Sequence, residues 1–365
     1  MIGDRVEDTR RLVEPHRQED TSVSTRPWNV AVVGAVGMVG TEMTRTLEER
    51  RFPVGELRPL DVAEYAGTPV PFGGRSWACL AATEANFDGI DIAIFSAGAE
   101  ASRHLAPLAV RRGAVVIDNS SAWRMDPACP LVVPEVNPGD LAWHKGIIAN
   151  PNCSTIQMVV VLKPLHDRAR VRRVVVSTYQ AAAGAGKAGV DELLQQTRDV
   201  VAGRPCGTPR IFQHQLAFNL IPQIDVFQED GYTKEEWKMV RETVKILGDP
   251  SVRVTATTVR VPVVVGHSES VNVETERKLT AADARALLAG APGVCVVDDP
   301  AAGAYPMPAP TAGTDPVFVG RIREDHSIER GLNLWIVADN VRKGAALNAV
   351  QIAERLAADD LVRVP

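Results

Sequence analysis

The chain has 365 residues, of which 45% are hydrophobic and 23% charged, a globular composition with enough length for two domains. Forty Lys and Arg stand against 45 Asp and Glu, and the formal net charge of -5 argues against a broad nucleic-acid-binding face. No apolar run approaches the roughly 18 residues that a membrane-spanning helix needs, so no membrane association is expected.

The first 26 residues carry charges throughout and show no apolar periodicity, and Pro27 ends the segment. We expect residues 1–26 to be a disordered extension and not a secretory signal, which would need an apolar core. Five cysteines, at 79, 129, 153, 206 and 295, show neither a disulfide framework nor CxxC metal spacing. This usage fits a reducing cytoplasm and predicts no bound metal.

Short apolar runs alternate with helical segments up to about residue 151. Four runs are typical of buried strands: 28–33, 57–60, 90–98 and 114–121. Two segments are typical of helices: 41–51 and 101–112. The alternation predicts a doubly wound parallel sheet of the Rossmann type. We expect this dinucleotide-binding domain to span 27–151 and to be completed by an amphipathic C-terminal helix within 343–365.

The pattern changes near residue 150. Residues 146–169 predict a strand, a tight turn and a long helix, and the segments 171–181 and 252–276 are extended without regular helices between them. Such segments predict a largely antiparallel α+β domain over 152–342. The expected fold class is therefore α/β, a Rossmann-type domain followed by an α+β domain.

A glycine-rich turn follows the first predicted strand. Gly34, Gly37 and Gly40 have GxxGxxG spacing, which lets the backbone approach a pyrophosphate at a helix N-terminus. Tight helix–strand packing is the alternative reason for such a trio, but its position directly after an apolar strand favours dinucleotide binding. Ser96 and Gly98 follow a later strand and are expected at the same edge of the sheet.

The end of the second predicted strand should contact the adenosine ribose. Asp61 lies somewhat farther from the glycine turn than the roughly 20 residues expected for the ribose-binding carboxylate, and Glu64 follows it. No Arg or Lys occurs between Arg58 and Arg75, so a 2′-phosphate would meet carboxylates here. We expect NADP or NAD as cofactor, with a weakened preference for NADP. The alternative is that both carboxylates are solvated loop residues.

Cys153, within Asn-Pro-Asn-Cys-Ser-Thr, follows a predicted buried strand and stands at the first turn of a helix. A helix N-terminus favours the reactive thiolate, and its backbone N–H groups can receive an oxyanion. A thiolate beside a nicotinamide cofactor indicates that the thiol adds to an aldehyde, hydride leaves and a thioester remains. The other four cysteines are expected to be core residues.

Acyl transfer coupled to hydride transfer needs a proton carrier, and His267 is the candidate among seven histidines. It is expected at the end of a long strand, where its side chain can face a cleft. A core or surface histidine is the alternative that this pattern leaves open.

The chain resembles the aspartate-semialdehyde dehydrogenase family from about residue 28 to 360. The resemblance rests on motifs in family order: GAVGMVG, FSAG, IDNSSAWR, VPEVN, NPNCST, STYQA, AFNLIPQID, GYTKEEWK, RVPVVVGHSES and DNVRKGAALNAVQIAE. It implies reversible NAD(P)H-dependent reductive dephosphorylation of L-4-aspartyl phosphate to L-aspartate 4-semialdehyde, in lysine, threonine and methionine biosynthesis. It also implies a homodimer or homotetramer in which residues 152–342 are the catalytic and dimerisation domain.

The resemblance assigns three catalytic roles: Cys153 is the acyl-thioester nucleophile, His267 the general acid/base, and Gln180 orients the substrate. It assigns contacts with the substrate and its phosphate to Arg124, Asn152, Glu235, Lys238 and Arg260. It assigns further cofactor contacts to Val36, Met38, Val39, Ala183, Gly184 and Asn340.

The chemistry of aspartyl phosphate agrees with these implied roles, because its ammonium, carboxylate and phosphate need one carboxylate and several cations. The planar fork of Arg260 suits the α-carboxylate, and Glu235 would accept the ammonium group. Lys238, as a point charge, suits the phosphate together with Arg124 and Asn152. On spacing alone, Glu235 and Lys238 are an ordinary i,i+3 pair on a helix.

The stretch from Val62 to Thr68 departs from the NADP-dependent members of the family, which carry Ser and Arg there in a sequence like SARSAGK. Here Glu64 stands in the place of the arginine. Two alternatives to the family's reaction remain: another acyl-phosphate reductase, such as one for N-acetylglutamyl phosphate, and a catalytically silent nucleotide-binding paralogue. The first would leave Glu235 without an ammonium partner, and the second would have no need of an intact Cys153 and His267.

Overall fold

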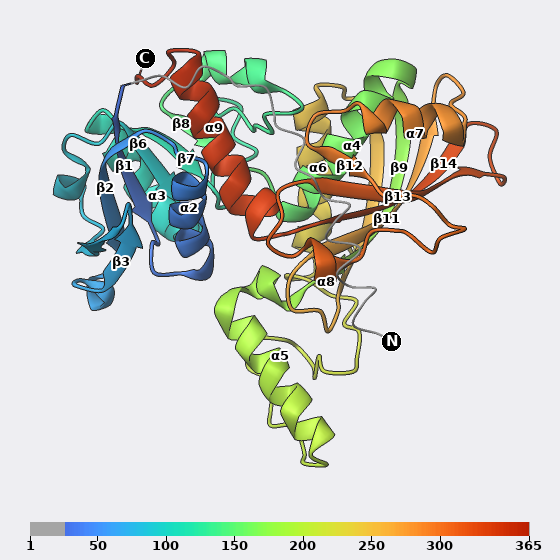
Figure 1. Ribbon diagram of the computed structural model, residues 1–365, viewed down its shortest axis with the longest axis horizontal. Helices are drawn as coiled ribbons and strands as arrows, with labels where there is room; N and C mark the ends of the chain where they lie inside the picture. Colours follow the sequence, from blue (N-terminus) through green and yellow to red (C-terminus); the bar gives the residue numbers. More distant parts are fainter. Residues whose placement is uncertain (1–25, 365) are drawn as a thin grey trace.

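The computed structural model describes residues 26–364, so the extension predicted for 1–26 lies outside the described residues except for Arg26. Two six-stranded sheets form the centres of two lobes that lie side by side (Figure 1). The first sheet belongs to the N-terminal part of the chain, and the second is built from residues beyond β8. None of the helices within 26–364 combines the length and apolarity needed to cross a membrane.

The first sheet has the strand order β5-β2-β1-β6-β7-β8, and all its pairings are parallel. Its strands are β1 (Trp28–Val33), β2 (Val54–Asp61), β5 (Leu80–Ala81), β6 (Ile92–Phe95), β7 (Val115–Asp118) and β8 (Ile147–Ala149). β6 and β7 are buried along their whole length, which explains their unbroken apolar sequence. A small hairpin of β3 (Pro69–Phe72) and β4 (Arg75–Ala78) follows β2.

Helices cover both faces of this sheet. α2 (Met38–Glu49) and α9 (Leu347–Ala358) pack on one face with Val30 and Ile94, while α3 (Gly98–Arg111) packs on the other with Ala93 and Phe95. The C-terminal segment thus returns to the first lobe. Helical structure begins with a π-helical turn, η5 (Arg342–Ala346), close to the predicted start at 343, and continues as α9, but the chain after Ala358 is not helical.

The second sheet has the strand order β10-β9-β11-β14-β13-β12. Its strands are β9 (Val171–Gln180), β10 (Arg253–Arg260), β11 (His267–Thr275), β12 (Val294–Val296), β13 (Val317–Asp325) and β14 (Gly331–Ala338). The three central pairings are antiparallel, but β9–β10 and β12–β13 are parallel. The predicted α/β class is confirmed, while the second sheet is mixed because helices do connect its outer strands.

The predicted extended segment 252–276 is two strands, which corrects the expected position of His267. The turn between β10 and β11 contains Pro262, which cannot donate to a ladder, and Gly266, whose φ of 98° is a conformation that favours glycine. His267 therefore begins β11 and does not end a long strand. The turn also pairs with η4 (Ala182–Ala185), since the Ala182 and Ala183 N–H groups donate to its carbonyls.

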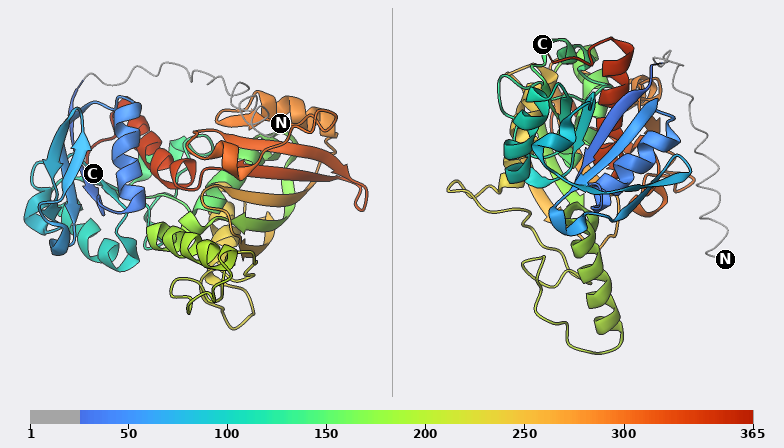
Figure 2. Two further views of the ribbon diagram at one scale, coloured as in Figure 1. Left: turned by 60° about the horizontal axis from the view of Figure 1, so that its bottom comes forward. Right: turned by 90° about the vertical axis from the view of Figure 1, so that its left-hand side faces the viewer.

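Helices pack on one face of the second sheet: α4 (Cys153–Ala169), α6 (Lys234–Leu247) and α7 (Ala281–Ala289) share its apolar core. α8 (Pro308–Thr311) is a single turn beside β14. α5 (Gly186–Val201) extends away from both lobes as an arm (Figures 1 and 2). All five cysteines are free; Cys79 and Cys129 are core residues as expected, but Cys206 and Cys295 are partly exposed.

Candidate active site

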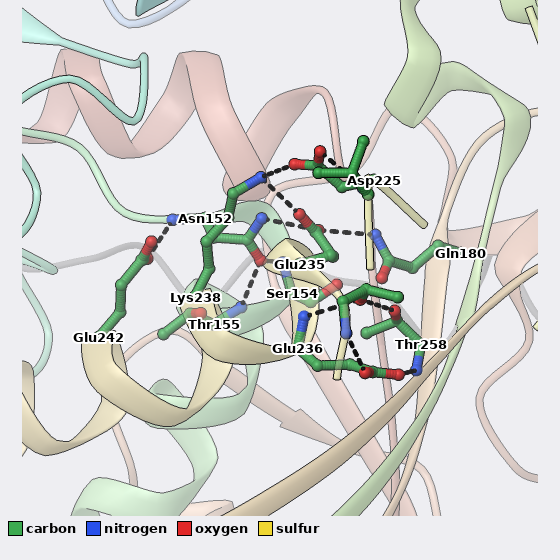
Figure 3. A network of polar contacts seen from close by, with 12 residues as sticks. Asn152, Ser154, Thr155, Gln180, Asp225, Glu235, Glu236, Lys238, Glu242 and Thr258 are labelled. Carbon is green, nitrogen blue, oxygen red and sulfur yellow. Dashed lines mark hydrogen bonds and ion pairs between the residues drawn. The ribbon is translucent and has the colours of Figure 1, made fainter. Parts of the chain in front are cut away.

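Cys153 is the first residue of α4, directly after the edge of the first sheet at β8. Asn152 caps this helix, because its Oδ1 accepts the N–H groups of Ser154 and Thr155 at 3.0 and 3.3 Å (Figure 3). The N–H of Asn152 itself donates to Glu242 at 2.7 Å. Most donors of this helix N-terminus are therefore occupied, contrary to the expectation that they are available to an oxyanion. Among residues 26–364 the Cys153 N–H has no acceptor.

The surroundings of Cys153 favour the thiol and oppose the thiolate that its position at a helix N-terminus predicts. The residue is partly exposed, yet burial by the surrounding protein, reinforced by the negative charge of Glu235, raises the pKa of the thiol to about 12. The cations Arg124 and Arg260 act in the opposite direction but are outweighed. The nucleophilic thiolate of Cys153 therefore requires a group that removes the thiol proton.

Glu235 is the centre of a hydrogen-bond network that includes Asn152, the residue before Cys153 (Figure 3). Its Oε1 accepts the side-chain amides of Asn152 at 2.8 Å and Gln180 at 3.2 Å, and its Oε2 pairs with the Lys238 ammonium at 2.9 Å. Burial alone would raise the pKa of Glu235, but Lys238 and the two amides outweigh it and lower the pKa to about 2. Glu235 is therefore ionised at neutral pH.

Two carboxylates that the sequence analysis missed hold the predicted phosphate cations. Asp225 pairs with Lys238 at 3.0 Å, and Glu242 pairs with Arg124 at 3.1 Å. Glu242 follows Glu235 by seven residues on α6, so helical spacing places it on the same face and could have indicated it. Asp225 lies in the loop before α6 and ends the AFNLIPQID motif, so the resemblance could have indicated it, although no local periodicity does.

The predicted phosphate cations line a cavity of about 640 Å³. Arg124 and Met125 of the first lobe form one side, and α6 with Lys238 and Glu242 forms the other. Arg124 also donates to the carbonyls of Asn119 and Asn150, so its guanidinium is fixed by three partners. The cavity therefore presents an oriented arginine and a lysine between the two lobes.

Arg260 and His267 lie on either side of the turn between β10 and β11. The Arg260 guanidinium donates to the Ala181 carbonyl at 2.7 Å, and the Ala181 N–H donates to His267 Nδ1 at 3.0 Å. His267 is fully buried, and burial, followed by the positive charge of Arg260, lowers its pKa to about 3. The Gly266 N–H before it donates to Asn340 at 2.9 Å, which ties this turn to the C-terminal segment.

At two glycines the backbone packs directly against side chains of the site. A Cβ added to Gly184 would lie 2.6 Å from Arg260 Nη1 and 3.3 Å from His267 Nε2. A Cβ added to Gly344, in the π-helical turn η5, would lie 2.8 Å from the Cys153 Cβ. π-helical turns are often found at functional sites. In this one, Gly344 lacks a side chain, so the backbone passes close to Cys153. Ala183, beside Gly184, is buried.

The glycine turn lies at the carboxyl edge of the first sheet. Gly34 has a φ of 81°, and a Cβ there would lie 2.5 Å from the Ser96 carbonyl oxygen, so this position requires glycine. Gly37 precedes α2 without a side-chain cap, and the free N–H groups of this helix start suit a pyrophosphate. The other predicted cofactor contacts of this edge lie in the turn, in the first residues of α2 and at the start of α3: Val36, Met38, Val39, Gly40 and Gly98.

Asp61 ends β2 and reaches the glycine turn. One carboxylate oxygen accepts the Val36 N–H at 3.0 Å and the other accepts the Val62 N–H at 2.9 Å. Glu64 is exposed in the short helix η1 (Ala63–Tyr65). Asp61 is thus part of the turn's hydrogen bonding, whereas Glu64 is a surface carboxylate. No cluster of three His, Cys, Asp or Glu side chains within 26–364 could hold a metal.

Two family descriptions match the chain and together span most of it. "Semialdehyde dehydrogenase, NAD binding domain" matches residues 29–144, and "Semialdehyde dehydrogenase, dimerisation domain" matches residues 162–343. These matches coincide with the first lobe and with the greater part of the second. The first matched range contains the glycine turn, and the second contains Gln180, Arg260 and His267.

Curated relatives and solved structures are similar over nearly the whole chain. The chain is 54% identical to the aspartate-semialdehyde dehydrogenase of Aquifex aeolicus and 51% identical to that of Bacillus subtilis, over 92% of this chain and 99% of each relative. The crystal structure of aspartate semialdehyde dehydrogenase II from Vibrio cholerae matches with a TM-score of 0.89 at 49% identity, over 92% of this chain and 99% of that one. A second structure of that protein was solved in complex with ASA.

Proposed function

This chain belongs to the aspartate-semialdehyde dehydrogenase family, an NAD(P)-dependent oxidoreductase family, and from that premise we propose that Cys153 is its acyl-thioester nucleophile. The observation that carries the proposal is the network beside Cys153. Asn152, which caps α4, is hydrogen-bonded in series with Glu235 of α6 and Gln180 of β9, and two arginines act on the thiol with their charge. A core cysteine would have no such polar surroundings.

The proposed reaction is the reversible conversion of L-4-aspartyl phosphate into L-aspartate 4-semialdehyde. The sulfur of Cys153 attacks the carbonyl carbon, the C–O bond to phosphate breaks, and a thioester forms. The nicotinamide cofactor supplies the hydride that reduces this thioester. The resulting thiohemiacetal on Cys153 collapses to the aldehyde, and His267 acts at the oxygen of this tetrahedral intermediate.

Substrate recognition follows from the charges around Cys153. Arg260 is buried and already oriented through the Ala181 carbonyl, and its remaining N–H groups suit the α-carboxylate of the substrate. Glu235 is ionised and suits the ammonium group. Lys238 and Arg124, on the cavity between the lobes, would bind the phosphate. Three charged groups of the substrate thus each find a group of opposite charge.

The first lobe fits a dinucleotide. The uncapped start of α2 offers N–H groups, and the absence of a side chain at Gly34 and Gly37 leaves the backbone open to a pyrophosphate. Gly184 lies over Arg260 and His267, where only backbone fits, so a nicotinamide ring would find no side chain from this residue in its way. Asn340 holds the adjacent turn through Gly266.

We propose that the preference for NADP is weakened and that NAD is accepted. The Asp61 carboxylate is held at the glycine turn by the Val36 and Val62 N–H groups, and Glu64 is exposed in the following helix η1. A carboxylate can accept a ribose 2′-hydroxyl but repels a 2′-phosphate. No arginine or lysine lies between Arg58 and Arg75 to offset this repulsion.

The test of the function is the oxidation of aspartate semialdehyde by the purified full-length chain, with NAD and NADP in parallel and with or without phosphate. We expect activity that depends on phosphate, because phosphate must release the acyl group from Cys153. We expect kcat/KM with NAD to equal or exceed that with NADP. Activity without phosphate would contradict the acyl-phosphate chemistry, and a tenfold or greater advantage of NADP would contradict the role of Asp61.

Glu235→Gln is expected to weaken selection for a free amino group. The wild-type protein should discriminate strongly against amine-blocked aspartate semialdehyde, because an ionised Glu235 would be left buried beside a neutral amide. In Glu235→Gln the ratio of kcat/KM for free over blocked substrate should fall at least about tenfold. An unchanged ratio would favour the alternative of a reductase for an N-acylated substrate. The matched control is Glu229→Gln, at an exposed glutamate that lines the cavity of about 640 Å³ together with Lys238.

We propose that the chain forms a homodimer through the face of the second sheet that α4, α6 and α7 leave uncovered. This face carries Tyr179 and Trp335, partly exposed and 5.4 Å apart between ring centroids. The match to a dimerisation domain over 162–343 supports an interface in this lobe. Ser270→Arg, on the exposed face of the central strand β11, should convert the dimer into a monomer by light scattering. A dimer that survives this change would contradict the proposal.

We also propose that the protein works in the cytoplasm, in lysine, threonine and methionine biosynthesis. Its five cysteines are all unpaired, which suits a reducing compartment. A reactive Cys153 would also need that compartment to stay reduced. Fractionation of cells that produce the protein checks the location.

A further inference from the structure

The cavity between the lobes is much larger than the phosphate group that Arg124 and Lys238 would bind in it. Its volume of about 640 Å³ is in the range of sites for drug-sized ligands, about 300–1,000 Å³. The elements around it are tied together, because Ser102 of α3 accepts the indole N–H of Trp123 at 2.9 Å and Lys245 of α6 donates to carbonyls of the following loop. The cavity is therefore a fixed feature, and part of its lining has no role in the proposed reaction.

The inner end of the cavity is formed by Arg124, Lys238 and Glu242. It adjoins the start of α4, because Glu242 accepts the N–H of the residue before Cys153 (Figure 3). Both inner cations are paired: Arg124 with Glu242 at 3.1 Å, and Lys238 with two carboxylates at 2.9 and 3.0 Å. A carboxylate beside a cation offsets part of its attraction for a phosphate dianion. The inner cations can therefore orient a phosphate but attract it only weakly from solution.

The outer end of the cavity is lined by three exposed cations: Arg103, Lys234 and Arg241. Arg103 belongs to α3 of the first lobe, and the other two belong to α6, where a spacing of seven residues places them on the same face as Lys238. Arg241 lies over the ring of Trp237, 4.5 Å from its centroid. Within residues 26–364 none of the three forms an ion pair with a carboxylate. Their charge is therefore available to an anion.

Two carboxylates of the loop before α6, Glu229 and Asp230, also line the outer end. Asp230 is occupied by the Trp237 indole N–H at 2.9 Å and by the Tyr232 N–H at 3.1 Å. Five cations and three carboxylates line the whole cavity, so its lining is net positive, whereas the chain carries a formal net charge of -5. A concave site whose charge is opposite to that of the protein concentrates the ions that the rest of the surface repels.

We propose that the outer end is an entry site for inorganic phosphate, where Arg103, Lys234 and Arg241 bind the dianion before it reaches Arg124 and Lys238. This inference rests on the proposed function, because phosphate is a substrate of that reaction in the oxidative direction. In the reductive direction the same site receives the phosphate that the nucleophile expels. The outer cations determine how fast phosphate arrives, and the inner cations determine how it is oriented.

The double variant Arg103→Gln/Lys234→Gln tests the entry site in the phosphate-dependent oxidation of aspartate semialdehyde. At low ionic strength kcat/KM for inorganic phosphate should fall about tenfold, because capture of the dianion loses two unpaired positive charges. At saturating phosphate kcat should stay within about twofold of the wild type, since the inner cations are unchanged. KM for aspartate semialdehyde and for the cofactor should also be retained.

Two further double variants are the controls. Lys145→Gln/Arg253→Gln removes two exposed cations that do not line the cavity, so the net charge changes equally, and kcat/KM for phosphate should stay within about twofold of the wild type. Arg103→Lys/Lys234→Arg keeps both charges in the cavity and should retain the wild-type value. Added sodium chloride should lower kcat/KM for phosphate more in the wild type than in Arg103→Gln/Lys234→Gln, because salt screens exposed charges.

The outcomes separate this inference from the proposed function. Equal kcat/KM for phosphate in Arg103→Gln/Lys234→Gln and in Lys145→Gln/Arg253→Gln would overturn the entry site alone. A loss of kcat, or an equal rise in KM for aspartate semialdehyde, would also overturn it, because the two cations would then shape the inner end. Oxidation of the semialdehyde by the wild type without phosphate would overturn the proposed function and the entry site with it.

Discussion

Replacement of Cys153 by Ala is expected to reduce kcat by more than about 10⁴-fold, because no other group can form the thioester. The change removes only the sulfur, and the neighbouring contacts that position the start of α4 run through the backbone and the side chain of Asn152. The fold and the glycine turn of the first lobe should therefore be retained. The measurements are kcat in the phosphate-dependent assay, cofactor affinity by fluorescence titration, and the thermal midpoint.

The matched control for this prediction is Cys295→Ala. Cys295 is partly exposed on β12, at the far edge of the second sheet, and makes no contact with the network around Glu235. It should lose neither turnover nor cofactor affinity. Turnover of the Cys153 variant within tenfold of the wild type would exclude a thioester at this position.

The same network shows why local sequence patterns located the nucleophile. Asn152 and Cys153 are adjacent, and the Asn-Pro-Asn-Cys sequence after an apolar run is a helix-start signal that the structure reproduces with Asn152 as the cap. The glycine turn after β1 is similarly local, since the strand, the turn and α2 follow one another directly. Features that neighbouring residues determine could therefore be read from the sequence.

The electrostatics of the site could not be read in this way. A helix N-terminus lowers the pKa of a thiol and therefore predicts a thiolate. Burial and the negative charge of Glu235, a residue of another helix, instead raise the pKa of the Cys153 thiol. The partners Asp225 and Glu242 reach the predicted cations from a loop and from the far end of a helical face. Such contacts depend on how α4 and α6 pack on the second sheet, which no periodicity encodes.

The sequence contains a partial indication of the break between β10 and β11. Pro262 and Gly266 lie within the predicted extended segment 252–276, and both residue types commonly interrupt strands. The break decides the chemistry, because it places Arg260 and His267 at the ends of two strands with the Ala181 peptide between them. A single strand would have pointed their side chains to opposite faces, since their positions differ by seven, an odd number.

Arg260→Lys is expected to lower kcat/KM for aspartate semialdehyde about 100-fold or more, through KM and kcat together, although the charge is kept. Arginine can bind the Ala181 carbonyl with one N–H and still present others to the substrate carboxylate in one plane. A lysine ammonium cannot make both contacts with this geometry, and an imperfectly paired carboxylate in a buried site costs about 2–5 kcal/mol. The expected loss corresponds to the lower part of this range.

The control is Arg253→Lys at the exposed start of the same strand, which should leave kcat/KM unchanged. Cofactor KM should be unaffected in both variants, because Arg260 lies in the second lobe and the glycine turn in the first. If Arg260→Lys retained wild-type kcat/KM, charge alone would bind the substrate carboxylate and the fork geometry would be irrelevant. A selective rise in KM for phosphate would instead move Arg260 from the substrate carboxylate to the phosphate.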